Sequence, residues 1–133
     1  MQYGELRLPG KMIGEAELEI MQVAWRAGEP LTAHSVLERL EGRNWKLSTL
    51  MTSLSRLVDK GFMSCDRSTG TNLYTAVCPE KDYKVQESRS FLEKLYGNSV
   101  QNLIATLYSG KVIESADVEE LRKFLDELEG KEC

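Results

Sequence analysis

Residues 48–77 read STLMTSLSRLVDKGFMSCDRSTGTNLYTAV, and this stretch decides the fold that the sequence predicts. Leucines at positions 50, 54 and 57 recur at helical spacing, which predicts a helix capped by Ser48 that runs through Lys60 and ends at Gly61. Two short runs follow, Phe62–Arg67 and Asn72–Val77, separated by the turn residues Ser-Thr-Gly-Thr. They predict a β-hairpin directly after the helix.

Two more helices are predicted upstream of this stretch. Hydrophobic residues at helical spacing predict a first helix from Glu15 to Ala27, ended by Gly28, and Thr32 is a natural cap for a second helix through Glu41. Three helices followed by a two-stranded hairpin are the order of a winged helix-turn-helix, whose third helix enters the major groove of DNA. The predicted fold class is therefore mainly α with a small antiparallel β wing.

Downstream of Pro79 the sequence predicts three amphipathic helices, over residues 81–96 and 99–108 and from a capping Ser115 to Leu128. We therefore expect a winged-helix DNA-binding domain over residues 1–78 and a helical dimerisation domain over residues 79–133. A second copy of the chain would cover the apolar stripes of these helices. The alternative is that the helices fold back on the first domain. The candidate dimerisation residues are Leu103, Ile104, Leu107, Val118, Leu121, Leu125 and Leu128.

Composition excludes several classes of protein. The 133 residues are 41% hydrophobic and 29% charged, which is typical of a folded chain with one ordinary domain or one small domain and a helical appendage. Apolar runs are too short to span a membrane, and the N-terminus lacks the apolar core of a signal peptide, so we expect a cytoplasmic protein without membrane insertion.

The residue types that carry catalysis and metal binding are scarce. One histidine, His34, and the widely spaced Cys65, Cys78 and Cys133 predict neither a zinc site nor a disulfide framework, and the thiols are expected to be reduced. The chain also lacks a glycine-rich phosphate loop and a recognisable nucleophile–base pair. We expect no enzyme activity, no metal and no cofactor.

The net charge of −4 is unevenly distributed. Residues 1–78 carry nine Lys/Arg and nine Asp/Glu, whereas residues 79–133 carry eight and twelve, so the negative excess lies in the C-terminal part. Within residues 39–67, six basic residues outnumber three acidic ones: Arg39, Arg43, Lys46, Arg56, Lys60 and Arg67 against Glu41, Asp59 and Asp66. Attraction to phosphates depends on such local fields, so the first part is the candidate DNA-binding half.

The outer face of the predicted third helix is unusual because most of its side chains are small or carry a hydroxyl group. Ser53 is expected to belong to this face. The candidate DNA-binding residues on and around it are Lys46, Ser48, Thr49, Met51, Thr52, Ser55, Arg56 and Arg67. The alternative for these residues is an ordinary exposed surface, and Arg56 could also pair with Asp59. Trp25 and Trp45 are expected to pack in the core, and His34 to lie at the surface or between helices.

Several short motifs occur in a fixed order along the chain. They are EAELEIM at 15–21 followed by Trp25, Trp45 four positions before Thr49, LSRLVDKGF at 54–62, Tyr74, FLEKLY at 91–96, and Glu119-Glu120-Leu121. In this order they resemble the penicillinase repressors of bacteria, the BlaI/MecI/CopY group of winged-helix transcription repressors. The resemblance implies a homodimer that binds a palindromic operator and represses transcription. In the beta-lactam-responsive branch it also implies a membrane sensor peptidase, which triggers cleavage in the dimerisation region.

The chain departs from the family pattern in three places. Ser48 and Met51 stand where members often carry basic residues, so we expect a different operator sequence, with Met51 against a thymine methyl group. The Asn-Phe pair of the cleavage position falls at Thr106–Leu107, and the chain contains no Asn-Phe dipeptide. The C-x-C motifs of the copper-responsive branch are absent. The releasing signal therefore stays open, and a protein–protein interaction module without sequence-specific DNA binding is the alternative function.

Overall fold

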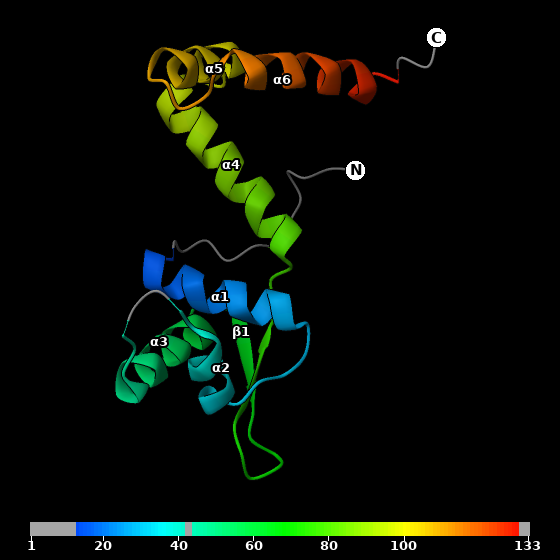
Figure 1. Cartoon of the computed structure of the whole chain (residues 1–133). Coiled ribbons are helices and arrows are strands. Elements are labelled where there is room, and N and C mark those ends of the chain that lie inside the picture. The colour runs from blue at the N-terminus through cyan, green and yellow to red at the C-terminus, as the bar shows by residue number, and fades with distance from the viewer. Residues whose placement is uncertain (1–12, 42–43, 131–133) are drawn as a thin grey trace. The chain divides into compact units, whose positions relative to one another are not determined.

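The computed structural model describes residues 13–41 and 44–130 (Figure 1). Arg43 and Cys133, both considered above, lie outside these residues, as does Gly42, the expected end of the second helix. The elements, in chain order, are α1 (Glu15–Ala27), α2 (Ala33–Arg39), α3 (Leu47–Asp59), β1 (Met63–Asp66), β2 (Leu73–Ala76), α4 (Glu80–Tyr96), α5 (Val100–Ser109) and α6 (Ser115–Leu128).

The chain forms two compact units that divide within α4, after Gln86. The first turns of α4 therefore belong to the first unit. The functional boundary expected after residue 78 stays a prediction.

Local signals set the ends of the first two helices. Gly28 ends α1 in the left-handed conformation, with φ of 66°, which glycine adopts without a steric penalty. Thr32 caps α2 as predicted, because its side chain accepts a hydrogen bond of 3.1 Å from the backbone N–H of Ser35. Helix α2 ends at Arg39, short of the predicted Glu41, because Leu40 is already extended.

The start of α3 differs from the prediction that Ser48 is the N-cap. The N–H of Leu50 already bonds the carbonyl of Lys46 at 3.0 Å, so Lys46 is the N-cap and Ser48 lies in the first turn. At the other end the helix stops at Asp59, and Gly61 has a φ of 89°. The chain turns there, and the N–H of Phe62 bonds the carbonyl of Leu57 at 2.9 Å.

The two strands form an antiparallel hairpin in which Met63 pairs with Ala76 and Asp66 with Leu73. Each strand is one residue shorter at both ends than predicted. An isolated bridge adds Leu31 beside Tyr74, with backbone hydrogen bonds of 2.9 and 2.7 Å. Three helices and a hairpin in this order make the first unit a winged helix-turn-helix.

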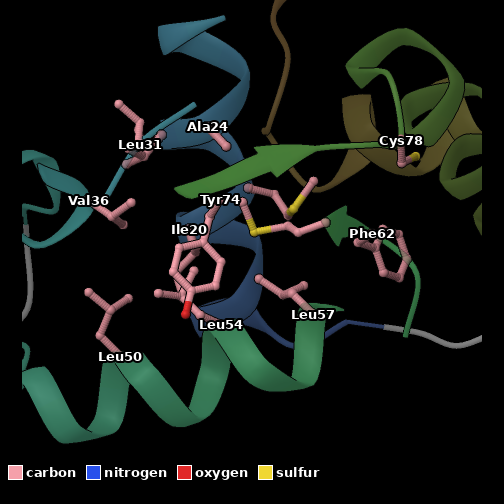
Figure 2. Packing of buried hydrophobic residues seen from close by; sticks show 13 residues of the cluster. Ile20, Ala24, Leu31, Val36, Leu50, Leu54, Leu57, Phe62, Tyr74 and Cys78 are labelled. Carbon is pink, nitrogen blue, oxygen red and sulfur yellow. The ribbon is translucent and has the colours of Figure 1, made fainter. Parts of the chain in front are cut away.

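The core of the first unit lies where α1, α3 and the hairpin meet. Figure 2 shows Leu50, Leu54 and Leu57 projecting from one side of α3 toward Ile20 and Tyr74. Trp25 and Trp45 are half-buried against this cluster, as expected. Ser53, which the sequence placed on the outer face, is buried. It lies beside Leu50, Leu54 and Leu57 on the inward side of the helix, at the edge of their stripe.

The last two helices follow the predicted pattern with one corrected cap. Ser99 caps α5, since its hydroxyl accepts a 3.1 Å hydrogen bond from the N–H of Asn102. The cap of α6 is Glu114 instead of Ser115, because the Glu114 N–H bonds the Asp117 carboxylate at 2.9 Å and leaves Ser115 inside the first turn. No residue of α4, α5 or α6 is buried in this single chain.

None of the helices within the described part of the chain combines the length and the apolar character that crossing a bilayer requires.

Candidate nucleic-acid interface

The outward side of α3 is the candidate reading surface. With the leucine stripe buried, Ser48, Thr52 and Ser55 follow one another at i, i+4 and i+7 along the middle of the exposed side. Thr49 and Arg56 flank this row on one side and Met51 on the other, and all six are exposed. The candidate residues of α3 thus share one face.

Small side chains along this row let a partner surface approach the helix closely. Thr52 is already oriented, because its hydroxyl donates a 3.1 Å hydrogen bond to the carbonyl of Ser48. Its oxygen is left as an acceptor and its methyl group as an apolar contact. Such a group accepts from the amino group of adenine or cytosine or packs against a thymine methyl.

Met51 makes the other flank of the face apolar. Met51 and Leu47 are each 37% exposed, and at this spacing they lie on the same side of α3. A thioether is flexible and polarizable and cannot form the paired hydrogen bonds that arginine makes to guanine. This flank therefore favours a methyl-bearing base edge.

Two further basic side chains are exposed outside the α3 face. Lys46 is exposed at the N-terminal end of α3, where the helix dipole adds positive potential, and Arg67 is exposed directly after β1. Within the described residues no ion pair joins Arg56 to Asp59, the pairing that the sequence left open. Lys60, by contrast, is engaged: its Nζ lies 2.9 Å from Oε1 of Glu17.

The Glu17–Lys60 pair is a positioning contact that the sequence did not reveal. The Glu17 carboxylate accepts hydrogen bonds from Lys60 Nζ at 2.9 and 3.2 Å and from the Gly14 N–H at 3.0 Å, and Glu17 is only 8% exposed. Burial raises the pKa of Glu17, but the Lys60 and Gly14 hydrogen bonds and the charges of Lys60 and Arg56 outweigh it and lower the pKa. The pair ties the start of α1 to the end of α3.

The turn between the strands has an ordered geometry of its own. The Asp66 carboxylate accepts hydrogen bonds from the Ser68 N–H at 2.9 Å and the Ser68 hydroxyl at 2.7 Å, and these bonds lower the pKa of Asp66. The Thr69 hydroxyl donates to the carbonyl of Thr71, and Gly70 has a φ of 87°. The backbone next to Arg67 is therefore held by hydrogen bonds within the turn.

The second unit carries an apolar groove of about 860 Å³ between α5 and α6. Four of the predicted dimerisation residues line it, namely Ile104, Val118, Leu121 and Leu125. Leu103 and Leu107 are half-buried and Leu128 is exposed, and none of these three lines the groove. Val100 and Tyr108, which the candidate list leaves out, also line the groove and are 58% and 49% exposed. Val100, Ile104 and Tyr108 recur every four residues, and this helical spacing was the available signal.

The Thr106–Leu107 bond lies inside α5. The Thr106 carbonyl accepts a 2.9 Å hydrogen bond from the Gly110 N–H, and the Leu107 carbonyl accepts one of 2.9 Å from the Val112 N–H. A protease that cuts here has to open these bonds first. The predicted cleavage region is therefore an intact helix in the folded chain.

No group of three or more His, Cys, Asp and Glu residues is placed to hold a metal ion within residues 13–41 and 44–130. Cys65 and Cys78 are free thiols. Burial, together with the charge of Asp82, raises the pKa of the Cys78 thiol, which disfavours the reactive thiolate. His34 is exposed on α2, in agreement with the expectation of a surface position.

Comparison with known proteins connects this geometry to a family. A family model described as the penicillinase repressor matches residues 13–127, which is most of the chain. This protein belongs to the penicillinase repressor family. The match spans both units, and so includes the reading surface and the groove.

Individual relatives of the family are distant in sequence but similar in length. The penicillinase repressor of Bacillus licheniformis is 28% identical over 115 residues, covering 86% of this chain and 90% of its own. The methicillin resistance regulatory protein MecI of Mammaliicoccus sciuri is 27% identical over 115 residues, covering 86% and 93%. A solution structure of monomeric BlaI from Bacillus licheniformis bound to the blaP half-operator is 31% identical, with a TM-score of 0.47, and covers 55% of this chain and 89% of that one.

Proposed function

We propose that this protein is a DNA-binding transcriptional repressor that binds a palindromic operator as a homodimer and has no chemistry of its own. The observation that carries the proposal is the exposed face of α3, formed by hydroxyl groups, one arginine and one methionine in the position of a recognition helix. The family membership supports the same function, since the two relatives described above are named as a repressor and a regulatory protein.

The roles of the individual residues follow from their chemistry. Thr49, Thr52 and Ser55 supply hydroxyl contacts to base edges, Met51 packs on a thymine methyl, and Arg56 contacts a base or a phosphate. Lys46 and Arg67 bind phosphates on either side of the reading surface, and Ser48 contacts the backbone or a base. With few guanidinium groups, this face favours operators rich in A·T pairs at the contacted positions.

The dimer is supported by the second unit. Helices α4, α5 and α6 bury no residue in the single chain, and the groove between α5 and α6 is lined mainly by apolar side chains. A second copy that fills this groove removes the apolar surface from water and places two copies of α3 on two half-sites. The operator-bound protein acts in the cytoplasm of a bacterial cell.

Release from DNA is the open part of the proposal. Partnership with a membrane sensor peptidase requires cleavage of a helical segment at Thr106–Leu107, which costs local unfolding of α5. A cleavage signal that acts here therefore has to destabilise the second unit first. Limited proteolysis of the dimer, followed by mass spectrometry, locates the first bond that is cut.

A protein–protein interaction module is the second candidate function. The observation in its favour is charge: the chain carries −4 overall, and exposed Asp59 lies at the C-terminal end of the α3 row, one helical turn after Ser55. A negative charge at this end reduces attraction to phosphates. Salt separates the candidates, because operator binding weakens steeply as counterions are released, whereas an apolar protein interface changes little.

The test is selection of bound duplexes from a random DNA pool, followed by fluorescence anisotropy of the enriched site across a salt series. We expect a palindrome, a steep salt slope, and a loss of about 1–3 kcal/mol for Arg56→Ala with the dimer intact. Glu120→Gln, an exposed change on α6, is the control and keeps the affinity of the wild type. Absence of an enriched sequence, with no binding even at low salt, contradicts the proposal.

A further inference from the structure

Two exposed apolar side chains lie next to each other at the start of α3. Leu47 is the first residue of the helix, Met51 follows one turn later, and each is 37% exposed. Side chains four positions apart on a helix lie on the same face, with their Cβ atoms about 5–6 Å apart. Leu47 and Met51 therefore form a short apolar ridge, which we call the α3 ridge.

The α3 ridge is separate from the core of the first unit. The three inward leucines of the helix are fully buried (Figure 2). Among the described residues, Leu47 and Met51 belong neither to the buried cluster nor to the half-buried side chains that pack against it, whereas Val58 of the same helix does pack there. The core is therefore closed without the ridge, and the ridge is available to a partner of this face.

The ridge borders the hydroxyl groups of the reading surface. Exposed Ser48 and Thr52 each follow one position after a ridge residue, and exposed Lys46 stands directly before the ridge at the N-cap. Recognition helices of the helix-turn-helix type contact base edges with their N-terminal residues. The first two turns of α3 hold the ridge, so it lies in the part of the helix that is expected to reach the bases.

The chemistry of the ridge restricts what it can recognise. Its side chains carry no hydrogen-bond donor, and their one heteroatom is a weakly accepting thioether sulfur, so they cannot read the donor and acceptor pattern of a base edge. A phosphate against them would lose water without gaining a hydrogen bond. The apolar feature that the major groove offers is the methyl group at C5 of thymine, and cytosine presents the same group when it is methylated at C5.

We propose that the α3 ridge reads two pyrimidine C5-methyl groups in each half-site, with Leu47 as a specificity-determining residue beside Met51. This rests on the proposed function, in which α3 is the recognition helix. The ridge spans about 6 Å along the helix at 1.5 Å per residue, which corresponds to about two base-pair steps of about 3.4 Å. The two methyl groups therefore lie within about two base-pair steps of each other. Because the contact is to the methyl group alone, C5 methylation of a cytosine at either position strengthens binding.

The experiment measures the affinity of the full-length protein for the selected palindrome by fluorescence anisotropy. Each thymine of one half-site is replaced in turn with deoxyuridine, which pairs as thymine does and lacks the methyl group. We expect a loss of about fourfold at each of the two positions that the ridge contacts, because one methyl-sized apolar group is no longer buried there.

Variants assign each position to a side chain. Leu47→Ala is expected to abolish the uracil loss at one position and Met51→Ala at the other, since a contact that is already missing cannot be lost again. Neither variant changes the salt slope, because neither side chain contacts a phosphate. Val77→Ala is the control: Val77 is an aliphatic residue of the first unit that is 57% exposed outside α3, and its variant keeps both losses.

A second set of duplexes separates the methyl group from the rest of thymine. A C·G pair stands at either contacted position, with the cytosine unmodified or methylated at C5. We expect the wild type to bind the methylated duplex about fourfold more tightly and the matching alanine variant to bind both equally. Leu47→Met keeps an apolar side chain and the methyl dependence. Leu47→Gln keeps the length and the helix propensity but removes that dependence, and it replaces Leu47→Ala if that variant does not fold.

The remaining outcomes overturn the proposal. Unchanged affinity for every uracil duplex, or uracil losses that all persist in Leu47→Ala, removes the role of Leu47 and leaves the proposed function standing. Equal binding of cytosine and 5-methylcytosine at both positions has the same consequence. A wild type that enriches no sequence at all contradicts the proposed function itself, and so differs from a wild type that binds its palindrome without regard to methyl groups.

Discussion

The two units of this chain use the same kind of amphipathic helix with opposite results. In the first unit, α1, α3 and the hairpin converge, and Ile20, Leu50, Leu54 and Leu57 are fully buried. In the second unit, α5 and α6 have equally clear apolar stripes and bury nothing, so that Val100 and Leu128 are 58% and 64% exposed. An apolar stripe indicates which side of a helix is expected to be buried. It does not indicate whether the same chain or another molecule buries that side.

The difference has a functional consequence. A unit with its own core presents a surface of fixed shape, whereas the proposed dimer makes the stability of the second unit depend on protein concentration. Clustered exposed apolar side chains are typical of an interaction site. We call the first unit the reader, and we call α5 and α6, the proposed dimerisation helices, the clasp.

The largest expected effect comes from opening the core of the reader. Leu54 is fully buried, so Leu54→Ala removes apolar contacts and leaves a cavity, with an expected loss of about 2–5 kcal/mol in the free energy of unfolding. Urea denaturation followed by tryptophan fluorescence measures it, because Trp25 and Trp45 both lie in the reader. Leu128→Ala, at an exposed position, is the control, and an equal loss in both variants removes the distinction between the units.

The next largest effect is on the clasp. Leu125 is 49% exposed and lines the groove, so Leu125→Glu places a charge in the proposed interface. We expect the dimerisation free energy to fall by about 2–4 kcal/mol, since a central apolar contact is replaced by a desolvated charge. Sedimentation equilibrium reports the change, and a variant that sediments as the wild type does argues against this groove as the interface.

The Glu17–Lys60 pair tests how the reader holds α3. Lys60→Met leaves the half-buried stem but removes the charge, and we expect a loss of about 1–3 kcal/mol at neutral pH because the carboxylate loses its charged partner. The folded-state pKa of Glu17 is lowered, so its contribution is fully present above the unfolded value near 4.5 and is lost as the pH falls through the folded value.

The matching measurement is urea stability of both proteins between neutral pH and about pH 3, a range that brackets the ordinary carboxyl pKa. The difference between the wild type and Lys60→Met is expected to shrink as the pH falls below 4.5. Lys84→Met, which removes the exposed partner of Glu80, serves as the control with little change in stability. A difference that stays constant across the range contradicts a role for the ion pair.

The smallest expected effect is on base preference. Met51→Ala removes an apolar contact at the edge of the reading surface, and we expect a loss of about 1 kcal/mol that is confined to operators with a thymine at the contacted position. The contribution of the methyl contact is measured by comparing binding to two duplexes that differ only in having thymine or uracil, which lacks the methyl group, at the contacted position. If the wild-type protein binds both duplexes with equal affinity, Met51 does not contact the thymine methyl group.

The sequence predicted the order of helices and strands in the first unit correctly, but it predicted some helix caps and side-chain contacts wrongly or not at all. Thr32 was predicted as a cap because its side-chain oxygen stands beside a clear apolar period, and its hydroxyl caps α2 in the structure. Ser48 and Ser115 were wrong as caps, because Lys46 and Glu114 are the N-caps and each serine lies inside the first turn. Serine is common both at the N-cap and in the first turn of a helix, so the residue type alone does not distinguish these two positions.

Contacts between distant residues were beyond the sequence. Glu17 and Lys60 are 43 positions apart, and each reads as an ordinary exposed charge until the fold brings them together. Trp25 and Tyr83 belong to separate predicted helices, and nothing in their spacing indicates that their rings meet. The candidate DNA-contacting residues were found because the leucine stripe of α3 determines its opposite face, with Ser53 as the exception at the border.

Hydrogen exchange of the full chain at two protein concentrations, one below and one above the dimerisation constant found by sedimentation, tests the division into reader and clasp most directly. We predict that backbone N–H groups of α1, α3 and the hairpin are equally protected at both concentrations, whereas those of α5 and α6 gain protection only as the dimer forms. Strong protection of α5 and α6 in the monomer, or loss of protection of α3 on dilution, contradicts the account.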